Sequence, residues 1–240
     1  MKKIAILSGA GMSAESGIST FRDSGGLWDK YPVEQVATPQ GYAANPQLVT
    51  TFYNERRKQL LEVQPNVGHQ LLATLEKEYE VVVITQNVDN LHERAGSTHV
   101  VHLHGELTKV TSSLDPENPA YIRSLEPEAW EVKIGDLAED GSQLRPFIVW
   151  FGEAVPKMEE AIDALKGVDY FVIIGTSMNV YPAAGLINYV PPTAKLFLID
   201  PNEVRVTNSR PITVIQEGAS EGVANLINYL QSNSNSPQYY

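Results

Sequence analysis

The chain has 240 residues, no cysteine, and 18 basic against 29 acidic residues, which gives a net charge of -11. The lack of cysteine excludes disulfides and thiolate zinc sites, and the acidic balance argues against a nucleic-acid surface while favouring a basic peptide as partner. No apolar run reaches the ~20 residues of a membrane span, so we expect no membrane contact and a cytoplasmic monomer.

Short apolar runs alternate with amphipathic segments along the chain. We predict strands at 3–7, 80–85, 100–104, 147–151, 170–174, 195–199 and 212–215, and helices at 46–63, 67–79, 158–165, 183–189 and 222–231. The first run resembles a short signal peptide, but it ends at Ser8-Gly9, and a buried strand explains it better. The alternation predicts an α/β fold with a doubly wound, parallel, Rossmann-like sheet.

Two segments, 16–44 and 108–144, interrupt this alternation. Structureless loops of that length are uncommon inside a compact domain, so we interpret them as parts of a smaller inserted lobe. We divide the chain into a large lobe of about 1–15, 66–107 and 144–231, a small lobe of about 16–65 and 108–143, and a loose tail at 232–240. A cleft between lobes is a usual place for a ligand.

A glycine-rich turn follows the first predicted strand. Gly9, Gly11 and Ala14 occupy the small positions of a G-x-G-x-x-G/A loop, which would let the backbone approach a pyrophosphate at a helix start. Residues 21–28 intervene where a standard dinucleotide fold continues to its second strand and acidic residue. Many turns of this kind are rich in glycine, so the loop alone does not establish nucleotide binding.

Polar side chains collect where two predicted strands end. Gln86, Asn87 and Asp89 follow the strand at 80–85, whereas His102 and His104 lie on the strand at 100–104 and would face one side. A histidine-rich metal site is conceivable here, but the spacing of a zinc motif is missing. A general base is the better interpretation, because histidine titrates near neutral pH.

Six motifs together carry a family resemblance. They are Gly9-Ala10-Gly11-Met12-Ser13-Ala14-Glu15-Ser16-Gly17-Ile18, Thr20-Phe21-Arg22, Thr85-Gln86-Asn87-Val88-Asp89, His104-Gly105, Phe151-Gly152-Glu153 and Gly175-Thr176-Ser177. As an ordered set they closely resemble the sirtuins, which are NAD-dependent protein lysine deacylases. The resemblance extends from the first strand to about Val204.

The resemblance implies a role for each motif. The residues that would hold NAD are Gly9, Ala10, Ser13, Ile18, Phe21, Arg22, Gln86, Asn87, Asp89, Gly175, Thr176, Ser177 and Asn202. The edges between which an acyl-lysine peptide would add as a strand include Phe151, Gly152, Glu153, Asn179 and Val180. The catalytic residues implied are Asn87, Asp89 and His104, with His104 as the general base.

The implied reaction consumes NAD as a cosubstrate and moves no hydride. His104 would take a proton from a ribose hydroxyl, and the products would be free lysine, nicotinamide and O-acyl-ADP-ribose. The alternatives are an NAD glycohydrolase or ADP-ribosyltransferase, or a non-catalytic sensor of NAD or ADP-ribose. Asn87, Asp89 and His104 argue against the sensor, and the peptide-binding edges favour deacylation.

The helix predicted at 46–63 carries an unusual charge. Arg56 falls on its apolar stripe, with Tyr53 three residues earlier, and the residues alone slightly favour a structural ion pair between Arg56 and a local glutamate. Tyr53-Asn54-Glu55-Arg56 nevertheless resembles the Tyr-x-x-Arg motif of the sirtuin branch that removes succinyl and malonyl groups. Ala37 matches the small pocket residue of that branch. The resemblance therefore implies a preference for acidic acyl groups over acetyl.

The chain departs from the family where the family has four zinc cysteines. Thr111, Ser112 and Ser113 stand where a first cysteine pair is expected, and 108–143 contains no histidine. We therefore predict a small lobe without zinc, held together by packing. Candidates for its apolar core are Tyr121, Ile122, Leu125, Trp130, Val132 and Ile134.

Overall fold

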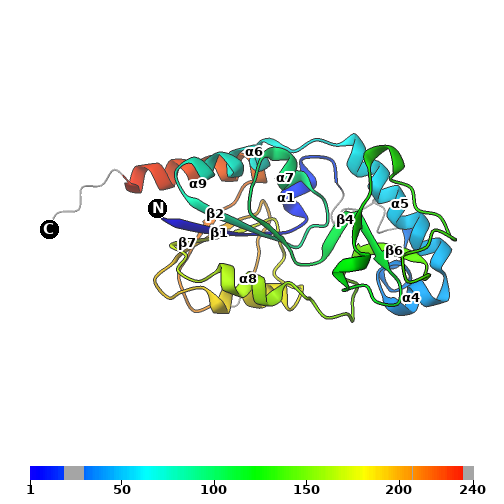
Figure 1. The fold of residues 1–240 in the computed structure, drawn as a ribbon. Coiled ribbons are helices and arrows are strands. Elements are labelled where there is room, and N and C mark those ends of the chain that lie inside the picture. Colours follow the sequence, from blue (N-terminus) through cyan, green and yellow to red (C-terminus); the bar gives the residue numbers. More distant parts are fainter. Residues whose placement is uncertain (19–29, 207, 235–240) are drawn as a thin grey trace.

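The computed structural model describes residues 1–18, 30–206 and 208–234. Its centre is a six-stranded sheet with the order β3-β2-β1-β7-β8-β9, in which all neighbouring strands are parallel (Figure 1). The strands are β1 (Lys3–Ser8), β2 (Glu80–Thr85), β3 (Val100–His102), β7 (Tyr170–Ile174), β8 (Lys195–Ile199) and β9 (Ile212–Ile215). The predicted α/β fold with a parallel sheet is confirmed.

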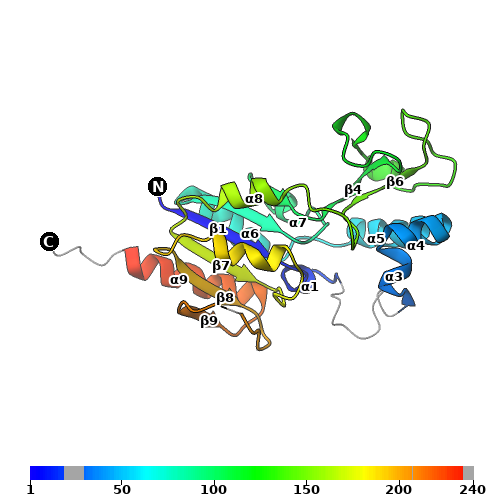
Figure 2. The same cartoon turned by 90° about the horizontal axis from the view of Figure 1, so that it is seen from below.

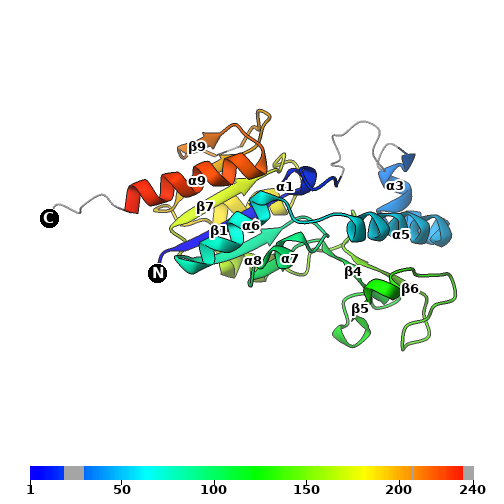
Figure 3. The same ribbon diagram turned by 90° about the horizontal axis from the view of Figure 1, so that it is seen from above.

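Helices cover both faces of this sheet. α6 (Val67–Thr74) and α9 (Ala219–Ser234) lie on one face, whereas α8 (Met158–Ala164) and the 3-10 helix η4 (Ala183–Tyr189) lie on the other (Figures 1 and 3). In β1, Ile4 and Ile6 pack toward α6 and α9, while Ala5 and Leu7 pack toward α8 and η4. Burial of both faces explains why the central strands are continuous apolar runs.

Local signals fix where the main helices begin. α5 (Pro46–Glu62) starts with proline, and Asn45 Oδ1 accepts a hydrogen bond from the Leu48 amide at 3.0 Å. α6 starts with a capping box in which Asn66 accepts from the His69 amide and His69 Nδ1 accepts from the Asn66 amide. The remaining short helices are α1 (Gly11–Ala14), α3 (Val33–Val36), α4 (Pro39–Ala44), η1 (Leu75–Lys77), α7 (Leu91–Ala95), η2 (Pro119–Tyr121) and η3 (Pro127–Ala129).

A second, antiparallel sheet with the order β5-β4-β6 lies beyond the carboxyl ends of the central strands (Figure 2). Its strands are β4 (Gly105–Ser112), β5 (Arg123–Ser124) and β6 (Leu144–Ile148). Helices α3, α4 and α5 pack beside this sheet. We call these three helices and three strands, with the loops between β4 and β6, the outer lobe. The outer lobe therefore faces the end of the central sheet where polar side chains collect.

Several predicted boundaries differ from the structure; for example, the helix predicted at 67–79 ends at Thr74 and is followed by η1. The strand predicted at 100–104 ends at His102, and the chain then turns so that β4 begins at Gly105, which adopts φ +81°. The strand predicted at 147–151 is β6, which ends at Ile148, because the chain turns at Gly152 with φ +94°. The final helix begins at Ala219 and continues to Ser234, into the predicted tail, of which 235–240 lie outside the described residues. In the part of the chain that the structure describes, no helix is long and apolar enough to cross a membrane.

The predicted core of the small lobe is only partly correct. Its buried cluster consists of Val110, Val132, Ala138 and Leu144, with Leu125 packed against it. Ile134 was expected in this core but is 48% exposed, and Tyr121, Ile122 and Trp130 are half-buried. Ala138 and the strand residues Val110 and Leu144 form the core instead, because β4 and β6 pair in this part of the lobe.

A hydroxyl group organises the loops where zinc cysteines would be expected. Ser112 Oγ donates to Asp140 at 2.5 Å and accepts hydrogen bonds from the backbone amides of Leu114 and Asp115 at 3.0 Å. Ser112 Oγ also lies 2.9 Å from Ser142 Oγ. The Ser112 side chain is fully buried. Its bonds connect the loop that follows β4 with the loop that precedes β6.

Candidate active site

The loops that follow β1, β2 and β7 meet at the carboxyl edge of the central sheet. The Gly9 amide donates to the Ile174 carbonyl, and the Gln86 amide donates to the Ser8 carbonyl, both at 2.9 Å. These bonds continue the parallel pairing one residue beyond the strands. Loops at such an edge are where open α/β sheets bind ligands.

The glycines of the first loop serve a contact that the sequence interpretation missed. A Cβ on Gly11 would lie 2.7 Å from Gly175 Cα, and a Cβ on Gly175 would lie 2.4 Å from the Met12 nitrogen. Gly175 also adopts φ +60°, which favours glycine. This close contact between two protein loops is a further reason for glycine at these positions, beside the predicted approach of a pyrophosphate.

Ser13 connects the two polar residues that follow β2. Its hydroxyl donates to Asp89 Oδ2 at 3.0 Å and accepts from Asn87 Nδ2 at 3.2 Å. Asn87 Nδ2 also donates to the Gly9 carbonyl at 3.0 Å, and Asp89 Oδ1 accepts from the Leu91 amide. Burial raises the pKa of Asp89, although the bonds from Leu91 and Ser13 oppose this shift. The side chains of Ser13, Asn87 and Asp89 are thus held in one fixed arrangement.

The hydrogen bond of His104 defines its tautomer. Its Nδ1 lies 3.0 Å from the Gln86 carbonyl oxygen, which can only accept, so the ring proton sits on Nδ1 and Nε2 carries the lone pair. Burial lowers the pKa of His104, and the bond to Gln86 only partly opposes this. The imidazole is therefore neutral near pH 7. The Gln86 side chain donates to Thr176 Oγ1 at 3.0 Å, which links the loop after β2 to the loop after β7.

The other two histidines of this region are buried under the loops. His92 Nε2 lies 3.0 Å from Ser8 Oγ, and its ring packs edge to face on His69. His102 Nδ1 lies 3.1 Å from the Asn87 carbonyl oxygen, and its Nε2 lies 2.6 Å from Glu93 Oε1. Sequence reasoning did not single out Glu93. Its place four residues after Asp89, in the first turn of α7, was the available signal.

Tyr53 and Arg56 lie beside Trp150 and Ala37 in the outer lobe. The Tyr53 hydroxyl is buried and accepts a hydrogen bond from Trp150 Nε1 at 3.0 Å. The Arg56 guanidinium carbon is 5.6 Å from the centre of the Tyr53 ring. Burial lowers the pKa of Arg56, while Tyr53 and the charge of Asp89 oppose that shift. Ala37 and Tyr53 belong to the same buried cluster, and Arg56 lies against the Tyr53 ring.

The predicted peptide edges differ in how much of their side chains they present. Phe151 is 49% exposed, and its amide donates to the Ala37 carbonyl at 2.9 Å. Glu153 instead turns inward, where it accepts two hydrogen bonds from Arg145 and one from the Trp150 amide. Its side chain therefore supports the turn at Gly152 and does not point outward. Asn179 is exposed, and Val180 is half-buried.

The remaining predicted residues are scattered around the loops. Ile18 is half-buried and packs against the outer-lobe cluster, and Ser177 is half-buried after β7. Ala10 precedes α1, and Asn202 is exposed just beyond β8, with its amide bonded to Asp200. Phe21 and Arg22 lie outside the described residues. Within residues 1–18, 30–206 and 208–234, no group of three or more metal-ligating side chains could hold a metal ion.

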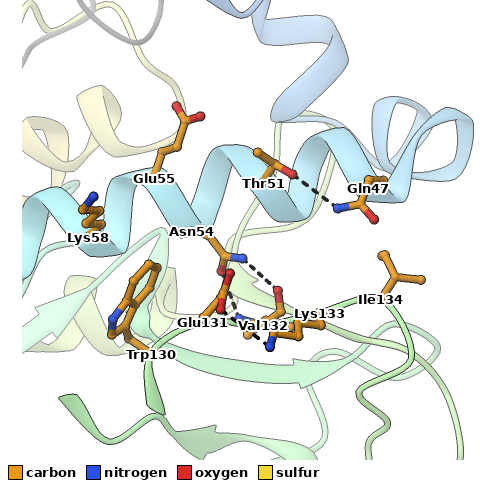
Figure 4. Close-up of a pocket in the computed structure, with 10 residues that line it drawn as sticks. All are labelled: Gln47, Thr51, Asn54, Glu55, Lys58, Trp130, Glu131, Val132, Lys133 and Ile134. Carbon is orange, nitrogen blue, oxygen red and sulfur yellow. Dashed lines mark hydrogen bonds and ion pairs between the residues drawn. The ribbon is translucent and has the colours of Figure 1, made fainter. Parts of the chain in front are cut away.

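A groove of about 410 Å³ lies away from this site, between α5 and the segment 130–134 (Figure 4). Asn54, at its floor, pairs with both backbone groups of Val132. Arg57, one turn along, donates to Asn54 Oδ1 at 2.9 Å and to the Leu107 carbonyl at 2.8 Å. Asn54 and Arg57 therefore fasten α5 to two separate parts of the outer lobe.

Comparison with known proteins identifies relatives along nearly the whole chain. A family model described as "Sir2 family" matches residues 9–182. An "NAD-dependent protein deacylase" of Bacteroides thetaiotaomicron is 70% identical over 226 residues, which cover 94% of this chain and 97% of the relative. A protein of the same description from Helicobacter pylori (strain J99) is 51% identical and covers 95% of this chain and 94% of its own length.

Solved structures agree with these relatives. A Sir2 homologue in complex with NAD superposes with a TM-score of 0.83 at 36% identity, covering 97% of this chain and 90% of that chain. A Sir2 protein with a deacetylated p53 peptide and 3'-O-acetyl ADP-ribose superposes with a TM-score of 0.75 at 29% identity, covering 94% and 92%. Both the fold and the order of the loops are therefore shared with these proteins.

Proposed function

Because this chain belongs to the Sir2 family and is an NAD-dependent protein deacylase, we propose that it removes acidic acyl groups, succinyl and malonyl, in preference to acetyl. The products would be free lysine, nicotinamide and O-acyl-ADP-ribose. The observation that carries this proposal is the position of the Arg56 guanidinium, which lies against the ring of the buried Tyr53 and hydrogen-bonds its side chain.

The polar groups at the carboxyl edge of the sheet fit the nicotinamide half of NAD. Asp89 offers a carboxylate that could accept from a carboxamide NH₂ group, and burial of that carboxylate makes such a bond strong. Asn87 and Gln86 would contact the adjoining ribose, while Gly9, Ala10, Ser13, Thr176 and Ser177 would line the phosphates. When bound, NAD supplies the ribose carbon that receives the acyl oxygen and the nicotinamide that leaves.

His104 is suited to take the proton of a ribose hydroxyl. Its Nδ1 proton is held by the Gln86 carbonyl, which directs the Nε2 lone pair away from the backbone. Its lowered pKa keeps the imidazole neutral, and a base must be neutral to accept a proton. The surrounding loops would exclude water, which NAD chemistry requires if hydrolysis is to be avoided.

A carboxylate on the acyl group would find two complementary partners in the outer lobe. Arg56 offers a planar set of donors, and the Tyr53 hydroxyl can donate as well as accept. Ala37 leaves room that a larger side chain would fill. A charged hydrogen bond contributes roughly 1.5–3 kcal/mol, or about ten- to 150-fold in selectivity, so succinyl should outcompete acetyl by a factor in this range.

The test compares kcat/KM for succinyl-, malonyl- and acetyl-lysine peptides, with products identified by mass spectrometry. We expect the wild type to prefer the acidic groups and Arg56→Met to lose that preference while retaining deacetylation. Lys58→Met removes an exposed cation from the groove face of the same helix, and it should change nothing. A wild type that prefers acetyl-lysine would refute the proposal. Nicotinamide release without any peptide would instead indicate a glycohydrolase.

A further inference from the structure

Two histidines hold two consecutive carbonyl groups of the loop after β2. His104 Nδ1 lies 3.0 Å from the Gln86 carbonyl oxygen, and His102 Nδ1 lies 3.1 Å from the Asn87 carbonyl oxygen. The loop between β2 and α7 has no regular backbone pairing of its own at these carbonyls. Buried carbonyls need a donor, so the two imidazoles fix the orientation of both peptide planes.

His102 differs from His104 in what binds its second nitrogen. Glu93 Oε1 lies 2.6 Å from His102 Nε2, so the ring donates on both sides when it is protonated. Burial lowers the pKa of His102, but the hydrogen bond and charge of Glu93 outweigh burial and raise it overall. Glu93 thus stabilises an imidazolium, in which the Nδ1 proton is donated to the Asn87 carbonyl and the Nε2 proton is donated to Glu93.

The carbonyl held by His102 belongs to a residue whose other polar groups are also fixed. The Asn87 amide donates to Thr85 Oγ1 at 3.0 Å, and its Nδ2 donates to Gly9 and Ser13. Of the polar atoms of Asn87, only the side-chain oxygen Oδ1 has no hydrogen bond to the part of the chain that the structure describes. The orientation of this oxygen is therefore set by the backbone that His102 restrains.

We propose that His102 and Glu93 form a positioning pair, which fixes the Asn87 peptide plane and thereby aims the Asn87 side chain at the nicotinamide ribose. The inference rests on the proposed role of Asn87 toward NAD, and it adds Glu93 and His102 to the residues on which NAD binding depends. Neither side chain would touch NAD.

Two substitutions of His102 separate the two ends of the imidazole. In His102→Asn, the amide nitrogen can occupy the place of Nδ1 and still donate to the Asn87 carbonyl, although the link to Glu93 is lost. In His102→Gln, the longer amide reaches the place of Nε2 and can bond Glu93, but the Asn87 carbonyl loses its donor. The two variants therefore have nearly the same size and polarity but opposite connections.

The readouts are KM for NAD, kcat, KM for whichever acyl-lysine peptide the wild type uses best, and NAD affinity by titration calorimetry. We expect His102→Gln to lower kcat/KM for NAD roughly ten- to 100-fold, the size of effect that small misplacements of reacting groups cause. KM for the peptide should stay unchanged. His102→Asn should lose clearly less than His102→Gln, and only the part that the link to Glu93 contributes. Equal loss in both variants, or no loss in His102→Gln, would overturn the proposal.

Glu93→Leu supplies an independent test if a His102 variant folds poorly. It leaves the Asn87 carbonyl bond in place but removes the partner that orients His102, so NAD affinity should fall in the same direction. Combining it with His102→Gln should add little, because both act on one peptide plane. Fully additive losses would contradict a joint role. Calorimetry reports on NAD even if no acyl preference is found, so failure of the acyl proposal remains distinguishable.

Discussion

The side-chain amide of Asn54 makes both hydrogen bonds that a neighbouring strand would make with Val132. Asn54 Nδ2 donates to the Val132 carbonyl at 2.7 Å, and the Val132 amide donates to Asn54 Oδ1 at 3.1 Å. Asn54 lies on α5 between Tyr53 and Arg56. The helix that carries the proposed acyl-binding residues is thus fastened directly to the core of the outer lobe.

Removing the two hydrogen bonds between Asn54 and Val132 should destabilise the protein. Asn54→Ala leaves the backbone groups of Val132 and one donor of Arg57 without partners, which we expect to cost about 1–3 kcal/mol in the free energy of unfolding. Urea unfolding measures the loss. Thr51→Ala, one turn away on an exposed position of the same groove, is the control and should be nearly neutral. An equal effect of both changes would mean that the hydrogen bonds of Asn54 with Val132 do not contribute to the free energy of unfolding.

The outer lobe should keep its structure without zinc. The chain has no cysteine, and Ser112 connects Asp140 with the amides of Leu114 and Asp115 through hydrogen bonds. We expect metal analysis to find no stoichiometric zinc and chelators to leave unfolding unchanged. Ser112→Ala should cost about 1–3 kcal/mol, because Asp140 loses a donor and two partly buried backbone amides lose their acceptor.

Ser113→Ala is the matched control for the Ser112 change. It removes a neighbouring hydroxyl for which the described part of the chain shows no hydrogen bond, so its effect on unfolding should be small. Stoichiometric zinc in the purified protein would contradict the prediction directly. So would a large stabilisation by added zinc.

The sequence predicted the central sheet well because its strands are buried on both faces. The strands at 80–85, 170–174, 195–199 and 212–215 have the predicted boundaries, since continuous apolar runs leave little choice of structure. β4 was missed because Glu106, Thr108 and Lys109 interrupt its apolar pattern. Its position depends on pairing with β6, which is distant in sequence and invisible to local patterns.

The same difference between local and distant information applies to the site. Asn87, Asp89 and His104 could be predicted as site residues because their motifs are contiguous in the sequence. Glu93 was missed because its link to His102 forms only when α7 packs over β3. The contact between Gly11 and Gly175 was not predicted, because it joins loops more than a hundred residues apart.

That contact can be tested by adding single methyl groups. Gly175→Ala would bring a Cβ within 2.4 Å of the Met12 nitrogen, so the loops after β1 and β7 must separate. Gly167→Ala places alanine at a similar φ of +71° but with no atom within 4 Å of its Cβ. The control should therefore cost only about 1–2 kcal/mol of backbone strain.

We expect Gly175→Ala to cost clearly more than this control and also to weaken NAD binding. Thermal unfolding and NAD titration together measure both effects. Equal stability of the two variants would show that the loops adjust without penalty, and that the glycine at 175 is needed only for its backbone angle.

A buried histidine should make the fold sensitive to mild acid. His69 is fully buried, and burial lowers its pKa to about 4, although Glu15 and Glu93 act in the opposite direction. The unfolded chain, with a histidine pKa of 6.5, binds the proton first as the pH falls. The stability that neutral His69 contributes is therefore complete above pH 6.5 and is lost between pH 6.5 and about 4. A pKa difference of this size corresponds to about 3 kcal/mol in the free energy of unfolding.

His69→Gln tests this without removing the helix cap. Glutamine at this position can accept the Asn66 amide bond as His69 Nδ1 does, since capping boxes favour glutamine there, but it does not titrate. His102 and Asp89, whose pKa values are raised, favour the folded state at lower pH, and they are present in both proteins. Their contributions cancel when the variant is compared with the wild type.

The free energy of unfolding should therefore fall less for His69→Gln than for the wild type between pH 7 and pH 4.5. The exposed His99→Gln should fall as the wild type does. Parallel pH profiles for the wild type and His69→Gln would mean that folding does not lower the pKa of His69.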